Sequence, residues 1–140
     1  MKKIIYSPGE PSGIGPDLII KLSSSKLWED LNIPIVSIGD PKLFIDRAAL
    51  LKKKIKIVEL ESLNEVSKNT KGLIQIIKVT KCSNSRPGKL SKSNAQYVLD
   101  NLTYSIKQTM QNEGTALVTG PLSKENVISI DKLFTGHTEY

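Results

Sequence analysis

The chain has 140 residues, of which 39% are hydrophobic and 24% charged, a balance typical of one globular domain and not of a disordered chain. It carries 20 Lys and Arg against 14 Asp and Glu, so its formal net charge is +6 at pH 7. No apolar run approaches the roughly 20 residues that span a bilayer, or the roughly 7–15 of a secretory signal. Together with a single cysteine, Cys82, these features predict a cytoplasmic protein without membrane partners.

The first half of the chain alternates β-prone runs with helical signals. Short apolar runs predict strands at residues 3–6, 34–38 and 55–58. Pro16 and Asp17 are typical of the first turn of a helix, which we expect to continue to residue 22. Asp40 followed by Pro41 is typical of a helix N-terminus, and the apolar pattern predicts that this second helix runs to residue 51.

The second half continues the alternation. We expect strands at 73–79 and 115–119, a loop at 81–89, and a short helix from about Ser123. A longer helix is predicted between the loop at 81–89 and the strand at 115–119, with Ser91 or Ser93 as its cap and Gly114 as its left-handed end. Its apolar positions recur at steps of three and four residues and form one face: Ala95, Val98, Leu99, Leu102, Ile106 and Met110.

Strands that alternate with helices predict an α/β fold, in which a mostly parallel sheet is flanked by helices. The region from 55 to 79 shows no clear helix between its two strands, which leaves an antiparallel pair open there. Residues 1–140 therefore read as a single α/β segment without internal repeats or low-complexity linkers.

The charge and the scarce cysteine and histidine limit the chemistry. The densest basic run, Lys52–Lys56, lies between a predicted helix end and a predicted strand, where lysines normally face water. Aromatic residues make up only 5%, so no stacking platform for bases is evident and no nucleic-acid partner is expected. One histidine and one cysteine cannot form a Cys/His zinc site, and we interpret Cys82 as a small, half-buried or exposed thiol.

Three polar, glycine-bearing segments follow predicted strands, where open α/β sheets bind ligands: residues 9–17, 119–121 and 135–139. The first contains Gly13-Ile14-Gly15, which resembles a dinucleotide-binding loop. Leu18 stands where the third glycine of that motif would be, and Pro16 lacks an N–H for a phosphate. A strand-to-helix turn that needs glycine torsions explains these residues at least as well.

The other two segments offer hydrogen-bond donors. Thr119-Gly120-Pro121 enters a helix that carries Lys124, an arrangement that suits an anion but is more often a capped helix with a surface lysine. His137 and Thr138 follow a glycine and could both donate to a phosphate or a carboxylate. From spacing alone, a structural role for this lone histidine is the more common outcome.

Taken together, four motifs resemble 4-hydroxythreonine-4-phosphate dehydrogenase, the NAD-dependent enzyme family of pyridoxal phosphate (vitamin B6) biosynthesis. Their order and approximate spacing match from the N-terminus to the last residue. The opening motif also resembles isocitrate and isopropylmalate dehydrogenases, and the resemblance implies the N-terminal part of their fold. The motifs are Gly9–Asp17, Asp46–Ala49, Thr119–Pro121 with Lys124, and Phe134–Glu139.

The resemblance implies a reaction and a substrate site. The family oxidises 4-phosphohydroxy-L-threonine with NAD to 2-amino-3-oxo-4-phosphohydroxybutyrate, which decarboxylates to 3-amino-2-oxopropyl phosphate. It implies a homodimer, a divalent metal (Zn, Mg or Co) as Lewis acid, and substrate contacts from His137 and Thr138. It assigns no catalytic, NAD-binding or metal-binding residue to this chain.

The chain is less than half the family's usual length, and the family's metal-binding histidines fall outside it. We therefore expect an N-terminal portion of a longer two-domain enzyme, inactive without the remainder. Two alternatives are a phosphate acyltransferase-like enzyme, against which the opening and final motifs argue, and a non-catalytic module that binds anions or nucleic acid.

Overall fold

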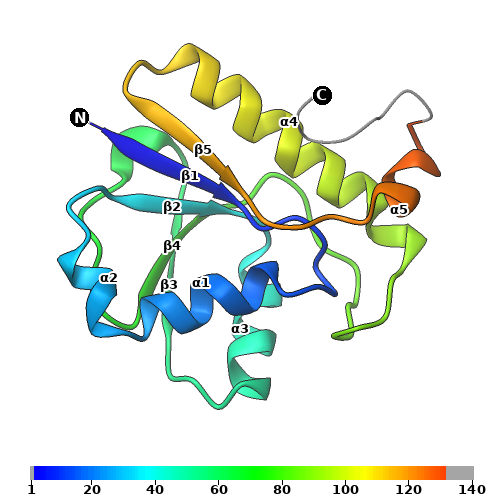
Figure 1. The fold of residues 1–140 in the computed structure, drawn as a ribbon, viewed down its shortest axis with the longest axis horizontal. Coiled ribbons are helices and arrows are strands. Elements are labelled where there is room, and N and C mark those ends of the chain that lie inside the picture. Colours follow the sequence, from blue (N-terminus) through cyan, green and yellow to red (C-terminus); the bar gives the residue numbers. More distant parts are fainter. Residues whose placement is uncertain (1, 132–140) are drawn as a thin grey trace.

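Five strands form one sheet within residues 2–131, the part of the chain that the computed structural model describes (Figure 1). The spatial order is β3-β4-β2-β1-β5, and every neighbouring pair is parallel. The predicted α/β class with a parallel sheet is therefore confirmed. The strands are β1 (Lys3–Ser7), β2 (Ile35–Ile38), β3 (Lys56–Leu60), β4 (Leu73–Ile77) and β5 (Thr115–Thr119).

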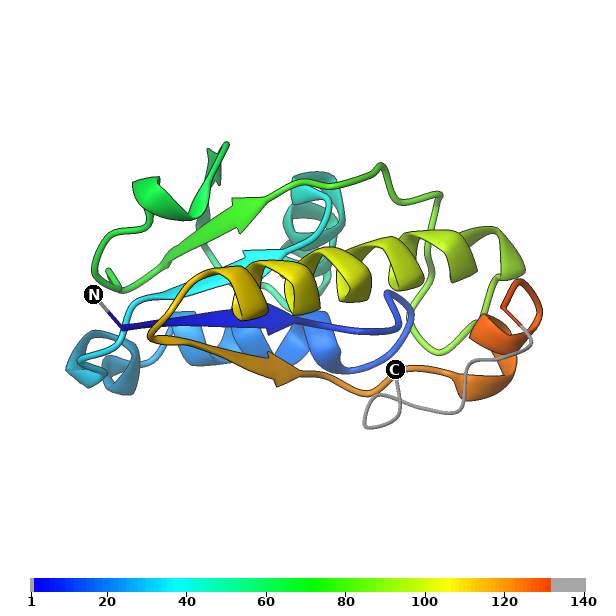
Figure 2. The same ribbon diagram turned by 90° about the horizontal axis from the view of Figure 1, so that it is seen from above.

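Helices cover both faces of the sheet (Figure 2). On one face α1 contacts β4 and α3, while α3 contacts β3; on the other, α4 contacts β1 and β5. Because all strands are parallel, their carboxyl ends meet at one edge, where the polar loops gather. The helices are α1 (Gly15–Ser23), α2 (Lys26–Asp30), α3 (Pro41–Leu50), α4 (Ala95–Gln111) and α5 (Lys124–Ile128).

Alternation along the strands divides the core into two layers. Tyr6 packs with residues of α1 and α3, whereas Ile5 packs on the opposite face, near Tyr104 of α4. Successive strand side chains point to opposite faces, so one strand contributes to both layers. Nearly continuous apolar strands such as 35–38 are what a parallel sheet covered on both faces requires.

The open question about residues 55–79 is settled in favour of a parallel pair. β3 pairs in parallel with β4 along their length, so the antiparallel alternative is wrong. The connection at 61–72 contains only a 3-10 turn, Leu63–Glu65, and is held by side-chain amides. Asn69 accepts from the Ile35 N–H at 3.0 Å and Gln75 accepts from the Ser67 N–H at 2.8 Å, which secures the crossover without a helix.

Several local predictions are confirmed and others are wrong. The Asp40 side chain caps α3 by accepting from the Lys42 N–H at 3.1 Å. Neither Ser91 nor Ser93 caps α4, because their hydroxyls bond to each other at 2.6 Å and the helix begins after Asn94. Gly114 has the predicted left-handed conformation, with φ +80°, but it lies in the turn to β5.

One α-helix was not predicted. Residues 26–30 form α2, whose Trp28 is 1% exposed and anchors the helix in the core. The lysines of the run 52–56 are exposed, as expected. In the described part of the chain, no helix has both the length and the apolar character needed to cross a bilayer.

Candidate functional site

The loop after β1 crosses closely over the exit of β5 at the carboxyl edge of the sheet. The Glu10 N–H donates to the Pro121 carbonyl at 2.9 Å, and the Gly120 N–H donates to the Ser7 carbonyl at 2.8 Å. Gly9 has φ +84°, and a Cβ there would overlap the Pro121 carbonyl. The glycines of two distant motifs thus let these two backbones meet.

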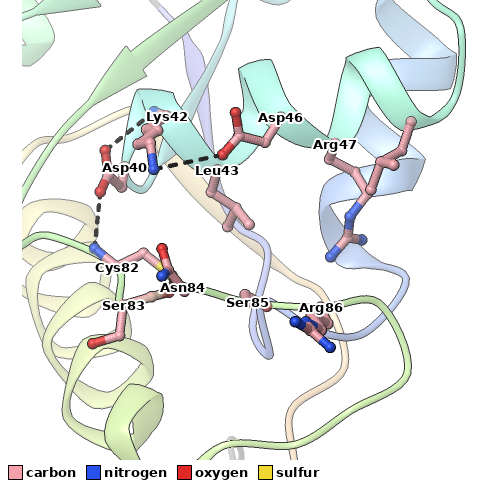
Figure 3. Close-up of a pocket in the computed structure, with 11 residues that line it drawn as sticks. Asp40, Lys42, Leu43, Asp46, Arg47, Cys82, Ser83, Asn84, Ser85 and Arg86 are labelled. Carbon is pink, nitrogen blue, oxygen red and sulfur yellow. Dashed lines mark hydrogen bonds and ion pairs between the residues drawn. The ribbon is translucent and has the colours of Figure 1, made fainter.

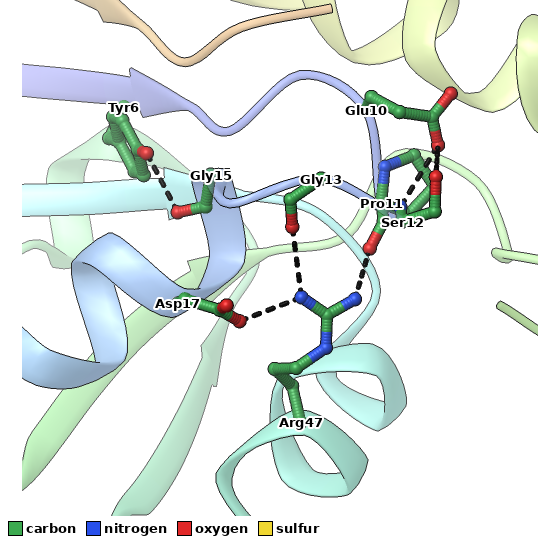
Figure 4. A network of polar contacts seen from close by, with 8 residues as sticks. All are labelled: Tyr6, Glu10, Pro11, Ser12, Gly13, Gly15, Asp17 and Arg47. Atoms are coloured by element: carbon green, nitrogen blue, oxygen red, sulfur yellow. Dashed lines mark hydrogen bonds and ion pairs between the residues drawn. The ribbon is translucent and has the colours of Figure 1, made fainter. Parts of the chain in front are cut away.

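A buried arginine holds the same loop from the side of α3 (Figure 4). The Arg47 guanidinium donates to the carbonyls of Pro11 and Gly13, the second at 2.9 Å. It also lies 2.7 Å from an Asp17 carboxylate oxygen, and the Arg47 side chain is only 3% exposed. Arg47 is thereby fully committed to the loop and to the first turn of α1, so we assign it a positioning role.

A buried carboxylate ties the loop to α5. Glu10, 6% exposed, accepts from the Ser12 N–H at 2.9 Å and the Ser12 hydroxyl at 3.0 Å (Figure 4). Its other oxygen accepts from the Asn126 side-chain amide at 3.3 Å, and that amide also donates to the Ser91 carbonyl at 3.0 Å. Segments far apart in sequence therefore converge on Glu10.

The glycines at 13 and 15 serve packing rather than torsion. Neither has a positive φ, so the expectation of glycine torsions at these two positions is wrong. A Cβ on Gly15 would overlap the Pro8 carbonyl, and the Gly15 carbonyl accepts from the Tyr6 hydroxyl at 2.8 Å. Burial raises the pKa of Tyr6 to about 12, so its hydroxyl keeps its proton and donates.

The segment after β5 behaves as a capped helix start. The Ser123 hydroxyl accepts from the Asn126 N–H at 3.2 Å, and Lys124 is exposed. Thr119, Gly120 and Pro121 lie at the carboxyl edge, as predicted. The surface-lysine interpretation therefore fits better than an anion site at this five-residue helix.

His137 and Thr138 lie outside the described residues, so their assignment to substrate stays a prediction. Among residues 2–131, no three His, Cys, Asp or Glu side chains gather closely enough to hold a metal ion. The described residues therefore supply no fit for the divalent metal that the family resemblance implies.

Sequence reasoning missed a pocket of about 260 Å³ between α3 and residues 82–86 (Figure 3). Cys82 lies in its wall, and its N–H donates to Asp40 at 2.9 Å. Burial, and next the nearby Asp40 carboxylate, raise the pKa of the Cys82 thiol to about 12, so the thiol is neutral near pH 7. The pocket lies between the segments that follow β2 and β4, which are neighbours in the sheet. The order of the strands would have indicated it, but the hydrophobic periodicity of the sequence does not give that order.

Comparison with known proteins gives a consistent result. Residues 30–140 match the family described as pyridoxal phosphate biosynthetic protein PdxA. The chain is 33% identical over 140 residues to 4-hydroxythreonine-4-phosphate dehydrogenase of Citrobacter koseri, and 34% identical over 139 residues to that of Shewanella frigidimarina. These alignments cover 100% and 99% of this chain but only 41% of each relative, so the chain spans less than half their length.

The fold comparison agrees. The solved structure of 4-hydroxythreonine-4-phosphate dehydrogenase from Klebsiella pneumoniae superimposes with a TM-score of 0.86 at 25% identity, covering 99% of this chain and 43% of that one. The Salmonella typhimurium structure described as a putative member gives a TM-score of 0.84 at 23% identity, which bears on the fold alone. From its sequence match and its fold, this chain belongs to the PdxA family of pyridoxal phosphate biosynthetic proteins.

Proposed function

We propose that this chain is part of an NAD-dependent dehydrogenase that oxidises 4-phosphohydroxy-L-threonine in pyridoxal phosphate biosynthesis. The observation that carries the proposal is the match over the whole chain to relatives named for this activity. The product of the proposed oxidation, 2-amino-3-oxo-4-phosphohydroxybutyrate, loses carbon dioxide to give 3-amino-2-oxopropyl phosphate. The family match favours this dehydrogenase over a phosphate acyltransferase.

In this proposal, His137 and Thr138 bind the substrate, and the described residues help to position the segment that carries them. α5 ends nine residues before His137 and is tied to the opening loop through Asn126 and Glu10. Arg47 fixes the far side of the same loop. These contacts support a role in orienting the substrate-binding segment.

In this proposal, the binding of NAD and of the divalent metal is assigned to the longer protein. When bound, NAD would accept the hydride and a divalent metal would polarise the alcohol oxygen. The described residues offer no metal cluster, so we derive no step through either group from this chain. We further propose a homodimer in the cytoplasm, with residues 1–140 as the N-terminal part of a two-domain enzyme.

Purified full-length protein, supplied with 4-phosphohydroxy-L-threonine, NAD and a divalent metal, should produce NADH, followed at 340 nm. Residues 1–140 alone should produce none, because this sequence has one histidine and its described residues form no cluster that could hold a metal ion. Absence of NADH formation by the full-length protein, under conditions where a known family member is active, would refute the proposed activity. Turnover by residues 1–140 would refute the need for the remainder.

A further inference from the structure

The carboxyl edge of the sheet has a second feature, which lies beyond the ends of β2 and β4 and does not involve the loop that follows β1. The crossover after β2 runs through α3 on one face, and the crossover after β4 runs through α4 on the opposite face (Figures 1 and 2). β2 and β4 are neighbours in the sheet. Where crossovers from neighbouring strands diverge in this way, a crevice opens beyond the strand ends, and α/β proteins bind ligands in it.

The pocket of about 260 Å³ lies at this divergence (Figure 3). One wall is α3, which begins directly after β2, and the other is the segment 82–86, which follows β4. A cavity of this size is large enough for a phosphate group and a short attached chain. The fold therefore places a preformed cavity where its topology favours ligand binding.

The lining provides uncommitted positive charge. Among residues 2–131, the Arg86 guanidinium has no ion-pair or hydrogen-bond partner, in contrast to the committed Arg47. Lys42 lies 3.9 Å from Asp46 in a loose pair whose side chains are 67% and 63% exposed. Such an exposed pair contributes little, so the Lys42 ammonium is available to a ligand anion.

The lining also holds a hydroxyl without a partner in the described part of the chain, at Ser85, and two carboxylates, Asp40 and Asp46. The Ser85 hydroxyl oxygen is shielded from solvent and has no partner within the described residues. A buried hydroxyl without a partner is unfavourable, and rotation of the Ser85 side chain about χ1 would let it donate to a ligand oxygen. The Asp40 carboxylate accepts from the Lys42 and Cys82 N–H groups. It also lies 4.0 Å from the Lys78 ammonium, which offsets its negative charge.

The segment 82–88 is held in place before any ligand arrives. The Ser83 N–H donates to the Asn94 side chain at 2.8 Å, and the Gly88 N–H donates to the Ser12 carbonyl at 2.7 Å. The Arg86 carbonyl, which lies between these anchors in the sequence, accepts from the N–H of Lys89, just after the second anchor, at 3.1 Å. A preorganised lining lowers the entropy cost of binding.

We propose that the pocket between α3 and residues 82–86 binds the phosphate group of a small molecule, with Arg86, Lys42 and Ser85 as its contacts. A phosphate carries about −1.5 to −2 charges near pH 7 and three acceptor oxygens, which match two cations and one hydroxyl. The proposal names none of the residues that the family resemblance assigns to the substrate, and it does not depend on the dehydrogenase activity.

The test is a titration of the purified full-length protein with inorganic phosphate at constant ionic strength, followed by heteronuclear NMR. Saturable shifts are expected at the amides of Lys42 and residues 83–86. Arg86→Ala should weaken the apparent affinity about tenfold or more, because it removes a charge-assisted hydrogen bond. Acetate at equal ionic strength should bind more weakly, since it carries a single charge.

One control variant separates this site from general attraction to a basic protein. Lys89→Ala removes the same charge from the same loop without touching the pocket, and should change the affinity less than twofold. Absence of shifts at residues 83–86, equal weakening by Arg86→Ala and Lys89→Ala, or tighter binding of acetate would overturn the proposal.

Discussion

Arg47 of α3 and Asp17 in the first turn of α1 form a largely buried ion pair, with 2.7 Å between Nη1 and Oδ1. The pair joins two helices of one face and fixes the loop that precedes α1. Because the same guanidinium also satisfies two loop carbonyls, its loss would leave several polar groups without partners.

We expect Arg47→Ala to lower the free energy of unfolding by about 3–5 kcal/mol, the range found when a buried pair loses one partner. Urea denaturation measures this change. Lys42→Ala is the matched control, because it removes a cation of the same helix from an exposed pair, at a cost of about 0.5 kcal/mol or less. Equal effects of the two substitutions would contradict the assigned role of Arg47.

The contact between the β1 and β5 exits predicts an unusual sensitivity at Gly120. A Cβ there would overlap the Pro8 carbonyl, so Gly120→Ala should cost about 3 kcal/mol. Gly72→Ala is the comparison, because Gly72 has φ +77° but a Cβ there would make only an ordinary contact, 3.8 Å from the Lys54 carbonyl. Backbone strain alone costs about 1–2 kcal/mol. Thermal and urea unfolding should rank Gly120→Ala as the more damaging; the reverse order would reject the packing argument.

Cys82 should alkylate slowly, with a rate that keeps increasing with pH. Burial raises the pKa of its thiol to about 12, so the thiolate fraction at pH 8.5 falls on the order of a thousandfold below that of an ordinary thiol. The iodoacetamide rate of the native protein should rise through pH 10 without a plateau. In urea the profile should level off above the ordinary thiol pKa; the same plateau in the native protein would contradict the burial effect.

The face of the sheet beside β5 predicts self-association of residues 1–140 expressed alone. β5 is an edge strand, Val118 is 47% exposed, and an apolar groove runs between α1 and β5, lined by Ile4, Tyr6, Leu18 and Leu22. Exposed edges and apolar patches favour association. Sedimentation should detect oligomers that Val118→Lys reduces, while Met110→Lys, on exposed α4 surface, does not. A sharp monomer would contradict this expectation.

Much of the fold follows from local signals. Asp40 and Pro41 predicted the start of α3 because capping is a property of a few adjacent residues. The order of the strands did not follow, because it depends on crossovers between distant segments. α2 was missed because it is five residues long and forms around one buried side chain, Trp28.

The candidate site, too, could be predicted only in part from the sequence. Motif position predicted that residues 9–17 and 119–121 lie at the carboxyl edge, since strand ends can be read locally. The committed role of Arg47 and the pocket beside Arg86 depend on side chains that meet only after folding. Periodicity carries no information on such contacts.

The substrate role of His137 gives the last prediction. A hydrogen bond to a charged group contributes about 1.5–3 kcal/mol, and about 1.4 kcal/mol corresponds to a tenfold change. His137→Ala in the full-length enzyme should therefore lower kcat/KM for 4-phosphohydroxy-L-threonine about ten- to a hundredfold. Because the family resemblance places the metal ligands elsewhere, metal content measured by atomic emission should stay stoichiometric. Loss of metal with the fold intact would make His137 a metal ligand, and unchanged kinetics would make it structural.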